Sequence, residues 1–211
     1  MTSLTASDIS ALFRQLRETM EENRDRLTKL DAALGDGDLG ITMAKGFTEA
    51  ASAVEDEDAT DIGRLLMRAG MTIAGHAPST MGTLIASGFM KAGKELKGSE
   101  SVDLGGILTL FSAFTNGIRE RGKAEPGDKT IIDALVPAVG VLQNAAGNNA
   151  SLREALDTAY KAAVEVAEST RSMTARHGRP SYYGDRSVGK EDPGSVVGVL
   201  ILKVFAEYTS G

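Results

Sequence analysis

Residues 5–20 read TASDISALFRQLRETM, and this stretch decides the class of fold. Its apolar side chains recur every three or four positions, which is the spacing of one face of an α-helix; they are Ile9, Leu12, Phe13, Leu16 and Met20. Thr5 and Asp8 precede them as a capping pair, because short oxygen side chains can accept the free N–H groups of a first helical turn. The stretch predicts an amphipathic helix that starts near Thr5.

The same spacing recurs along the chain and predicts eight helices. Leu27, Leu30 and Leu34 extend the first helix toward residue 34. The others are expected near residues 38–54, 62–73, 84–96, 104–118, 129–146, 151–175 and 192–208. Pro137 should kink the sixth, since proline lacks the N–H group and crowds the preceding turn. The acidic run at residues 55–58 is expected to be a solvated loop.

Two helix starts are marked by their caps. Ser151 and Glu154 form a capping box, and Asp192 followed by Pro193 places an acid at the N-cap and proline at the first helical position. We find no hairpin signal, internal repeat or shift in composition. Sequential helices with short links pack as antiparallel neighbours. The sequence therefore predicts an all-α, up-and-down bundle that forms a single domain over residues 1–211.

Composition excludes several classes of function. The formal net charge is −6 and no block of lysine and arginine stands out, which gives no support for nucleic-acid binding. Cysteine is absent, which excludes disulfides, thiolate metal sites and cysteine nucleophiles. No stretch approaches the roughly 20 apolar residues that span a bilayer, and no signal peptide is recognised. We expect a cytoplasmic protein that does not enter the membrane.

The segment with the clearest chemistry is DAALGDGDLG at residues 31–40. Asp31, Asp36 and Asp38 would repel one another unless a cation lies between them, and magnesium prefers hard oxygen ligands of this kind. The intervening glycines permit a sharp turn. Asp38 is expected to cap the next helix, whose N-terminus is a ready anion site. The alternative is a solvated acidic turn without a metal.

Four other irregular segments are rich in glycine and hydroxyl or basic side chains. They lie at residues 75–83, 121–130, 178–186 and 192–195. Each alone is most simply a connection between helices, but alternate loops of an up-and-down bundle fall at the same end. Together they can form a pocket for a phosphorylated ligand. His76 and His177 are expected to be surface or loop residues and not catalytic bases.

Three segments resemble the L subunit of dihydroxyacetone kinase. They are DAALGDGDLGITMAKGF at residues 31–47, GKAEPGDKTIIDALVP at 122–137 and ARHGRPSYYGDRSVGKEDPG at 175–194. Their order and the chain length also match. The resemblance implies an eight-helix antiparallel barrel with a nucleotide, ADP or ATP, at one end, and two magnesium ions held by Asp31, Asp36 and Asp38.

The resemblance also implies a set of residues around the nucleotide. They are Leu39, Gly40, Ile41, Thr42, Gly122, Ile131, Arg179, Asp192, Pro193 and Gly194, with Ala77, Ser79 or Thr80 in place of a serine of the family. Two departures from the family pattern stand out: Leu39 replaces a histidine, and the loop from Gly75 to Thr80 is shorter. The nucleotide is therefore expected to be held somewhat differently, and the sugar need not be dihydroxyacetone.

The family divides the reaction between two proteins. A K subunit binds the ketose, the L subunit carries the nucleotide, and the phosphate comes from ATP or from a phosphotransferase-system protein that rephosphorylates bound ADP. We expect this chain to be inactive on sugar alone, with Arg179 contacting phosphate, and a homodimer stays an open alternative. The rival hypotheses are a nucleotide-dependent regulatory protein and a fatty-acid-kinase-like nucleotide domain.

Overall fold

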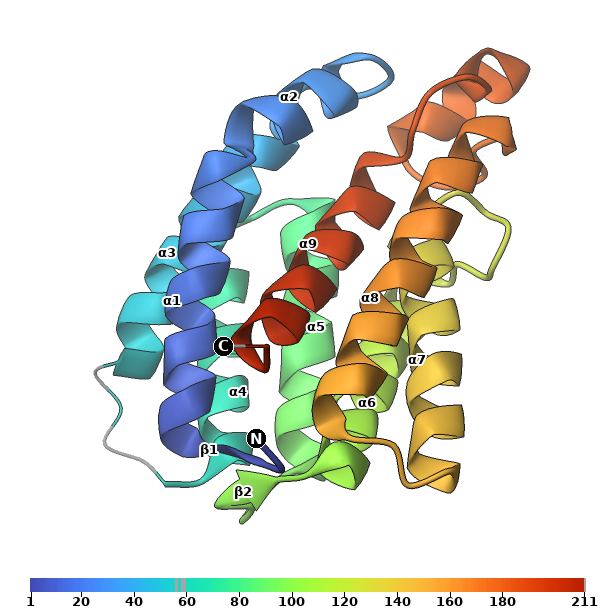
Figure 1. Ribbon diagram of the computed structural model, residues 1–211. Helices are drawn as coiled ribbons and strands as arrows, with labels where there is room; N and C mark the ends of the chain where they lie inside the picture. Colours follow the sequence, from blue (N-terminus) through green and yellow to red (C-terminus); the bar gives the residue numbers. More distant parts are fainter. Residues whose placement is uncertain (56, 58–59, 211) are drawn as a thin grey trace.

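The computed structural model describes residues 1–55, 57 and 60–210, and helices dominate it (Figure 1). The α-helices are α1 (Ala6–Glu22), α2 (Arg24–Ala32), α3 (Leu39–Glu55), α4 (Ile62–His76), α5 (Thr80–Glu95), α6 (Leu104–Gly122), α7 (Ile131–Gly147), α8 (Leu152–Ser169) and α9 (Pro193–Tyr208). Two 3₁₀ helices, η1 (Thr170–Ser172) and η2 (Arg179–Ser187), and two short strands, β1 (Leu4–Thr5) and β2 (Ser101–Val102), complete the described chain.

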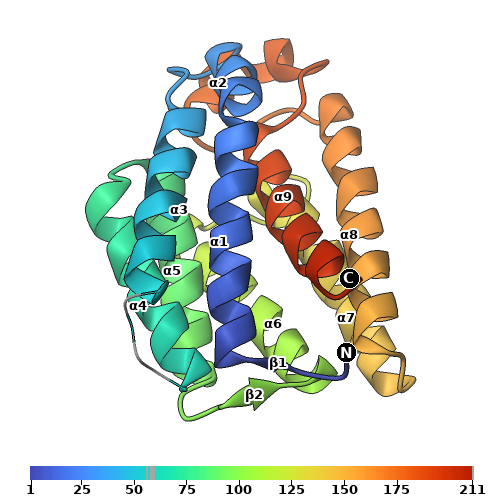
Figure 2. The same cartoon turned by 60° about the vertical axis from the view of Figure 1, so that its left-hand side comes forward.

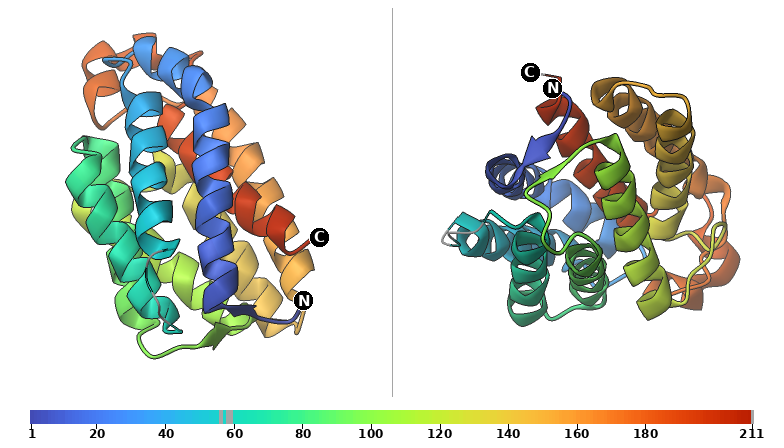
Figure 3. Two further views of the ribbon diagram at one scale, coloured as in Figure 1. Left: turned by 90° about the vertical axis from the view of Figure 1, so that its left-hand side faces the viewer. Right: turned by 90° about the horizontal axis from the view of Figure 1, so that it is seen from below.

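Eight of the helices form a closed antiparallel ring, as predicted. Helix α1 packs against α3, each helix from α3 to α8 packs against its successor, and α9 packs against α1. The view along the barrel shows this ring end on (Figure 3). The ninth α-helix of the described residues, α2, packs on α3 at one end of the barrel (Figure 2).

The first predicted helix is in fact two. It breaks at Asn23, which has φ −94° and ψ 4°, and α2 begins at Arg24. The Asn23 side chain donates to the Thr19 carbonyl at 2.9 Å, which gives the chain a local alternative to continued helix. The break lets α2 turn away from α1 and carry Asp31 to the end of the barrel (Figure 1).

Three other features differ from the prediction. Helix α8 ends at Ser169 and not near Ala175, because the buried Thr170 hydroxyl accepts the Asp192 N–H at 3.0 Å and the chain turns there. Strands β1 and β2 form an antiparallel ladder that no hairpin signal announced, since their residues lie far apart in sequence. Glu55, the last residue of α3, is exposed as predicted, whereas the side chain of Glu57 is only 17% exposed and pairs with Arg64 at 2.5 Å. The predicted loop residues Asp56 and Asp58 lie outside the described residues.

The core holds the barrel together through packed phenylalanine rings. The ring of Phe89 lies 5.2 Å from that of Phe13, 6.1 Å from Phe47 and 4.8 Å from Phe114, measured between centroids. Tilted and edge-on ring pairs at these separations are favourable beyond their burial. These side chains come from α1, α3, α5 and α6, so the cluster joins four helices of the barrel. None of the described helices combines the length and the apolar character that a membrane crossing requires.

Alternate helices start at the same end of the barrel. Helices α3, α5, α7 and α9 all begin at the end where α2 lies, and the loops before them gather there (Figure 1). The predicted caps Ser151 and Asp192 are confirmed: each side-chain oxygen accepts an N–H group of the helix that follows it. Because a helix N-terminus carries partial positive charge, this end suits an anion.

Candidate nucleotide and metal site

The turn between α2 and α3 brings three carboxylates together. Ligand oxygens of Asp31, Asp36 and Asp38 all lie within 4.8 Å of one another. Two glycines permit the turn: Gly37 has φ 74°, and a Cβ on Gly35 would lie 2.2 Å from Asp31 Oδ1. The sequence predicted this cluster of acids, and the structure gives it the geometry of a small oxygen-lined site.

Asp31 also fixes the start of α3. Its Oδ2 accepts the N–H groups of Asp38 at 3.0 Å and of Leu39 at 3.3 Å. The sequence assigned this capping role to Asp38; α3 does begin directly after Asp38, but the acceptor is Asp31 from the preceding helix. Gly40 allows the close approach of the two helices, because a Cβ there would lie 2.0 Å from the Arg24 carbonyl oxygen.

The charges of the cluster explain what it can bind. Burial first, and then the nearby Asp36 and Asp31 carboxylates, raise the pKa of Asp38, while Arg179 opposes the rise. Arg179 Nη2 lies 2.8 Å from Asp36 Oδ2, so one positive charge offsets only part of the negative charge of the three carboxylates. Hard carboxylate oxygens at this spacing, with negative charge left uncompensated, suit a divalent cation such as magnesium.

The residues expected around the nucleotide lie at the same end but differ in exposure. Leu39 is only 6% exposed and belongs to the core, whereas Ile41 is 58% exposed. Ala77 is buried, Ser79 accepts the Gly82 N–H at 3.0 Å as the cap of α5, and Thr80 is exposed. The Ser79 hydroxyl is therefore already engaged in ordering the loop before α5.

Gly194 marks the point where three helix starts meet. A Cβ on Gly194 would lie 2.9 Å from Met81 Cε and 3.2 Å from the Ile131 amide nitrogen. Met81 is in the first turn of α5, Ile131 is the first residue of α7 and Gly194 is in the first turn of α9. Gly122 ends α6 beside Leu84 of α5. The starts of α5, α7 and α9 therefore lie in contact, and the roles of the predicted nucleotide residues stay predictions.

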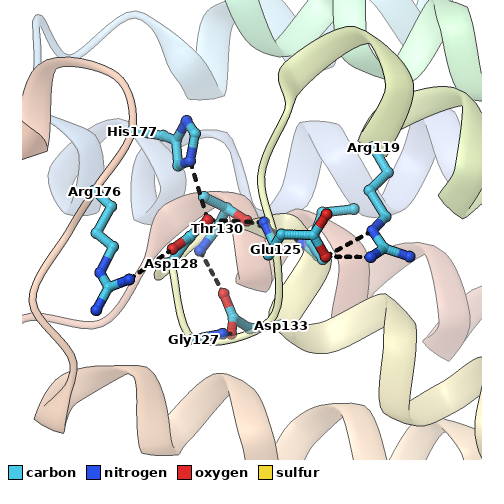
Figure 4. Close-up of polar contacts among 9 residues, drawn as sticks. Arg119, Glu125, Gly127, Asp128, Thr130, Asp133, Arg176 and His177 are labelled. Carbon is cyan, nitrogen blue, oxygen red and sulfur yellow. Dashed lines mark hydrogen bonds and ion pairs between the residues drawn. The ribbon is translucent and has the colours of Figure 1, made fainter.

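At this end of the barrel a polar network connects the loop before α7 with the segment before η2 (Figure 4). His177 Nε2 lies 3.1 Å from Asp128 Oδ2, and Arg176 Nη1 lies 3.6 Å from Asp128 Oδ1. Burial alone would raise the pKa of Asp128, but hydrogen bonds from the Glu125 N–H and from His177 hold that pKa below its usual value. Asp133 accepts the N–H of Gly127 at 2.5 Å on the same loop.

Lys129 is the least expected member of the network. Sequence placed it in the sixth helix, but it precedes α7, has φ 62° and is 3% exposed. Its Nζ donates to the carbonyl of Met173, which precedes η2, at 3.1 Å and to that of Ser187, the last residue of η2, at 2.6 Å. Burial lowers the pKa of Lys129, and the nearby Asp192 opposes that fall. No local pattern in the sequence predicts that a lysine is buried and donates to two carbonyls.

An open hollow of about 500 Å³ adjoins the carboxylates. Leu34 and Gly35 line it on the α2 side, and η2 contributes Arg179, Tyr182, Tyr183 and Arg186. Arg186 stacks over the Tyr183 ring at 5.5 Å from its centroid. The hollow places two arginines beside the predicted metal ligands, an arrangement that suits a negatively charged group.

Asp192 makes the stability of this end depend on pH. Burial raises its pKa to about 7, although hydrogen bonds from Ser195 oppose the rise. Between about pH 4 and pH 7 the folded protein keeps a proton that the unfolded chain has lost, so the free energy of unfolding falls as pH rises. We expect wild type to lose stability relative to Asp192→Asn across this window, as measured by urea unfolding at several pH values. Parallel curves for the two proteins would contradict the assignment.

The protein is a helical barrel with a carboxylate cluster and four helix starts at one end, an arrangement that suits the binding of a divalent cation and an anion at that end. The sequence matches the DAK2 domain family over residues 33–207, and the chain belongs to that family. It is 33% identical to the ADP-binding subunit DhaL of the PEP-dependent dihydroxyacetone kinase of Escherichia coli K12, over 97% of both chains. The corresponding subunit of kinase 2 of Listeria innocua is 35% identical, over 94% of both chains.

Longer kinases contain the same domain. The L-erythrulose 1-kinase of Mycolicibacterium smegmatis is 33% identical over 96% of this chain, which spans 36% of that relative. The crystal structure of the dihydroxyacetone kinase from C. freundii in complex with AMP-PNP and Mg²⁺ matches with TM-score 0.75 and 25% identity. It covers 98% of this chain, which spans 34% of that one. These likenesses confirm the predicted family and the predicted all-helical fold.

Proposed function

We propose that this chain is the nucleotide-carrying subunit of a kinase that phosphorylates dihydroxyacetone or a related ketose. The observation that carries the proposal is the set of three carboxylates within 4.8 Å of one another beside the start of α3. Full-length likeness to subunits named as ADP-binding supports the same assignment. We assign the whole chain to one domain. We also assign it to the cytoplasm, because nucleotides and phosphoenolpyruvate are present in that compartment.

Asp31, Asp36 and Asp38 would hold two magnesium ions together with the nucleotide phosphates. Bound magnesium supplies positive charge that neutralises phosphate oxygens as the phosphoryl group moves. The starts of α3, α5, α7 and α9 would face the phosphates with the positive ends of their dipoles and with the first-turn N–H groups that the caps leave free. Arg179 is the proposed phosphate contact of the protein, and no side chain is assigned as a general base.

The sugar would be held by a separate K subunit that docks over this end of the barrel. In-line transfer needs donor and acceptor within a few ångströms, so the loops around the nucleotide must also form the interface. The phosphate donor would be ATP or a phosphotransferase-system protein; the relatives named as PEP-dependent favour the second. A homodimer is compatible with this scheme and is tested by light scattering.

The exposed aromatic side chains of η2 are the proposed contacts with the K subunit. Tyr182 is 86% and Tyr183 40% exposed, and tyrosine is enriched at binding hot spots. We expect Tyr183→Ala to weaken the complex with the cognate K subunit by about 1–2 kcal/mol and to weaken ADP binding less than it weakens the complex. Calorimetry measures both affinities. Met71→Ala, which removes another exposed side chain on α4, is the matched control and should change neither.

A reconstituted kinase assay tests the proposal as a whole. The protein, the K subunit and a panel of ketoses are combined with either ATP or phosphoenolpyruvate and phosphotransferase proteins. Turnover should need both subunits and one of the donors. If the chain phosphorylates a sugar unaided, the division of labour is wrong. If no combination turns over while nucleotide still binds, the regulatory hypothesis takes its place.

A further inference from the structure

Arg179 pairs with a carboxylate that the proposed metal site needs. Its guanidinium lies 2.8 Å from Asp36 Oδ2, and Asp36 is one of the three clustered acids. We propose that Arg179 is a tethered counter-ion of this cluster, which competes with the divalent cation for Asp36 and is released when the cation binds. The inference rests on the proposed function, since it concerns the same cluster, but it assigns the cluster a state without metal.

The competition follows from geometry and charge. Magnesium requires near-octahedral ligands at about 2.0–2.1 Å, so an oxygen already donated to by a guanidinium must change partner or geometry to serve it. The arginine charge also repels an incoming cation a few ångströms away. Breaking this ion pair costs little free energy, because the side chain of Arg179 is 64% exposed and that of Asp36 is 39% exposed. Arg179 can therefore stabilise the empty cluster without blocking it.

The η2 segment is built to release Arg179 without disturbing the barrel. Gly178 just before it has φ 63°, and Gly184 within it has φ 52° and ψ −128°, so regular helix is interrupted on both sides of the tyrosines. The ends of the loop are held independently, because Lys129 bonds to the Met173 and Ser187 carbonyls. The fixed ends and the interrupted middle allow the segment around Arg179 to shift alone.

This exchange would couple the two ligands of the site. Without a cation, Arg179 pairs with Asp36. When the cation binds Asp36, Arg179 is released and can contact the phosphate in the adjoining hollow. The positive charge needed for phosphoryl transfer is then delivered only to a metal-loaded site. Magnesium alone should bind more weakly than it would without Arg179, because the arginine competes for Asp36. The released arginine should then strengthen the binding of nucleotide.

The test is magnesium binding in the absence of nucleotide. Isothermal calorimetry with magnesium chloride compares wild type, Arg179→Ala, Arg179→Lys and Arg186→Ala. Arg179→Ala should bind magnesium roughly threefold to tenfold more tightly than wild type, while Arg179→Lys, which keeps the charge, should stay near wild type. Arg186→Ala is the matched control, because it removes one positive charge from η2 while its guanidinium stacks on Tyr183.

Hydrogen exchange supplies a second readout. Magnesium alone should speed amide exchange in residues 179–187 of wild type and leave it unchanged in Arg179→Ala. An Arg179→Ala protein that binds magnesium no more tightly than wild type overturns the proposal, as does equal tightening by Arg186→Ala or unchanged exchange in wild type. Wild type is titrated in parallel with ADP in the presence of magnesium. Binding there upholds the proposed function even if the competition fails, and loss of binding refutes the function itself.

Discussion

Replacing Asp36 with alanine is expected to weaken the binding of ADP with magnesium by about 100-fold or more. Losing a side chain that merely supports a metal ligand costs about 10- to 100-fold, and a direct ligand should cost at least as much. The barrel should keep its stability, since Asp36 is an exposed residue in a turn and its removal relieves repulsion with Asp31 and Asp38. Calorimetry measures the affinity and urea unfolding measures the stability.

Asp31 offers a comparison within the same cluster. Because Asp31 Oδ2 also accepts the N–H groups of Asp38 and Leu39, Asp31→Ala should lose nucleotide binding and about 1 kcal/mol of stability as well. Asp31→Asn keeps an oxygen acceptor and should retain most of that stability while still binding metal poorly. Undiminished ADP affinity in Asp36→Ala would refute the cluster's role, whatever the stabilities show.

The second large effect concerns the contact between α4 and α5. A Cβ on Gly63 would lie 2.5 Å from the Gly93 carbonyl oxygen and 2.6 Å from the Lys97 amide nitrogen, so both obstacles are backbone atoms. Gly63→Ala is therefore expected to force the helices apart and to lower the free energy of unfolding by about 2–3 kcal/mol. Urea unfolding followed by circular dichroism measures the loss.

Gly75 is the matched control, because it lies in the same helix and has no atom within 4 Å of its would-be Cβ. Gly75→Ala should raise stability by about 0.5–1 kcal/mol, since alanine favours helix and restricts the unfolded chain. The same substitution in one helix should thus have opposite signs at the two positions. Equal effects would mean that α4 and α5 do not pack as closely as described.

Helical periodicity predicted the barrel because each stripe of apolar residues faces one common core. The stripe of Ile9, Leu12 and Phe13 and the caps at Ser151 and Asp192 were sufficient to place their helices. The boundaries that failed depend on contacts between distant residues. Helix α8 stops early because Thr170 meets Asp192, and strand β1 exists because it pairs with β2 at the end of the barrel away from α2.

The candidate site was predictable only where its residues are close in sequence. Three acids and two glycines within one turn predicted a cluster of carboxylates that the structure confirms, and the cation that would relieve their repulsion stays a prediction. Arg179 was expected to meet a phosphate, but its pairing with Asp36 depends on how η2 lies against the α2–α3 turn. The buried Lys129 was read as helical, since nothing local shows that its amine reaches two carbonyls of another loop.

The central claim is that nucleotide binds through a cation held by Asp31, Asp36 and Asp38. The most direct measurement is a calorimetric titration of ADP into the wild-type protein, once with magnesium and once with EDTA and no divalent cation. We predict clear binding with magnesium and, because three unshielded carboxylates would then face the phosphates, a loss of nearly all of it with EDTA. Equal affinity under the two conditions would contradict the claim.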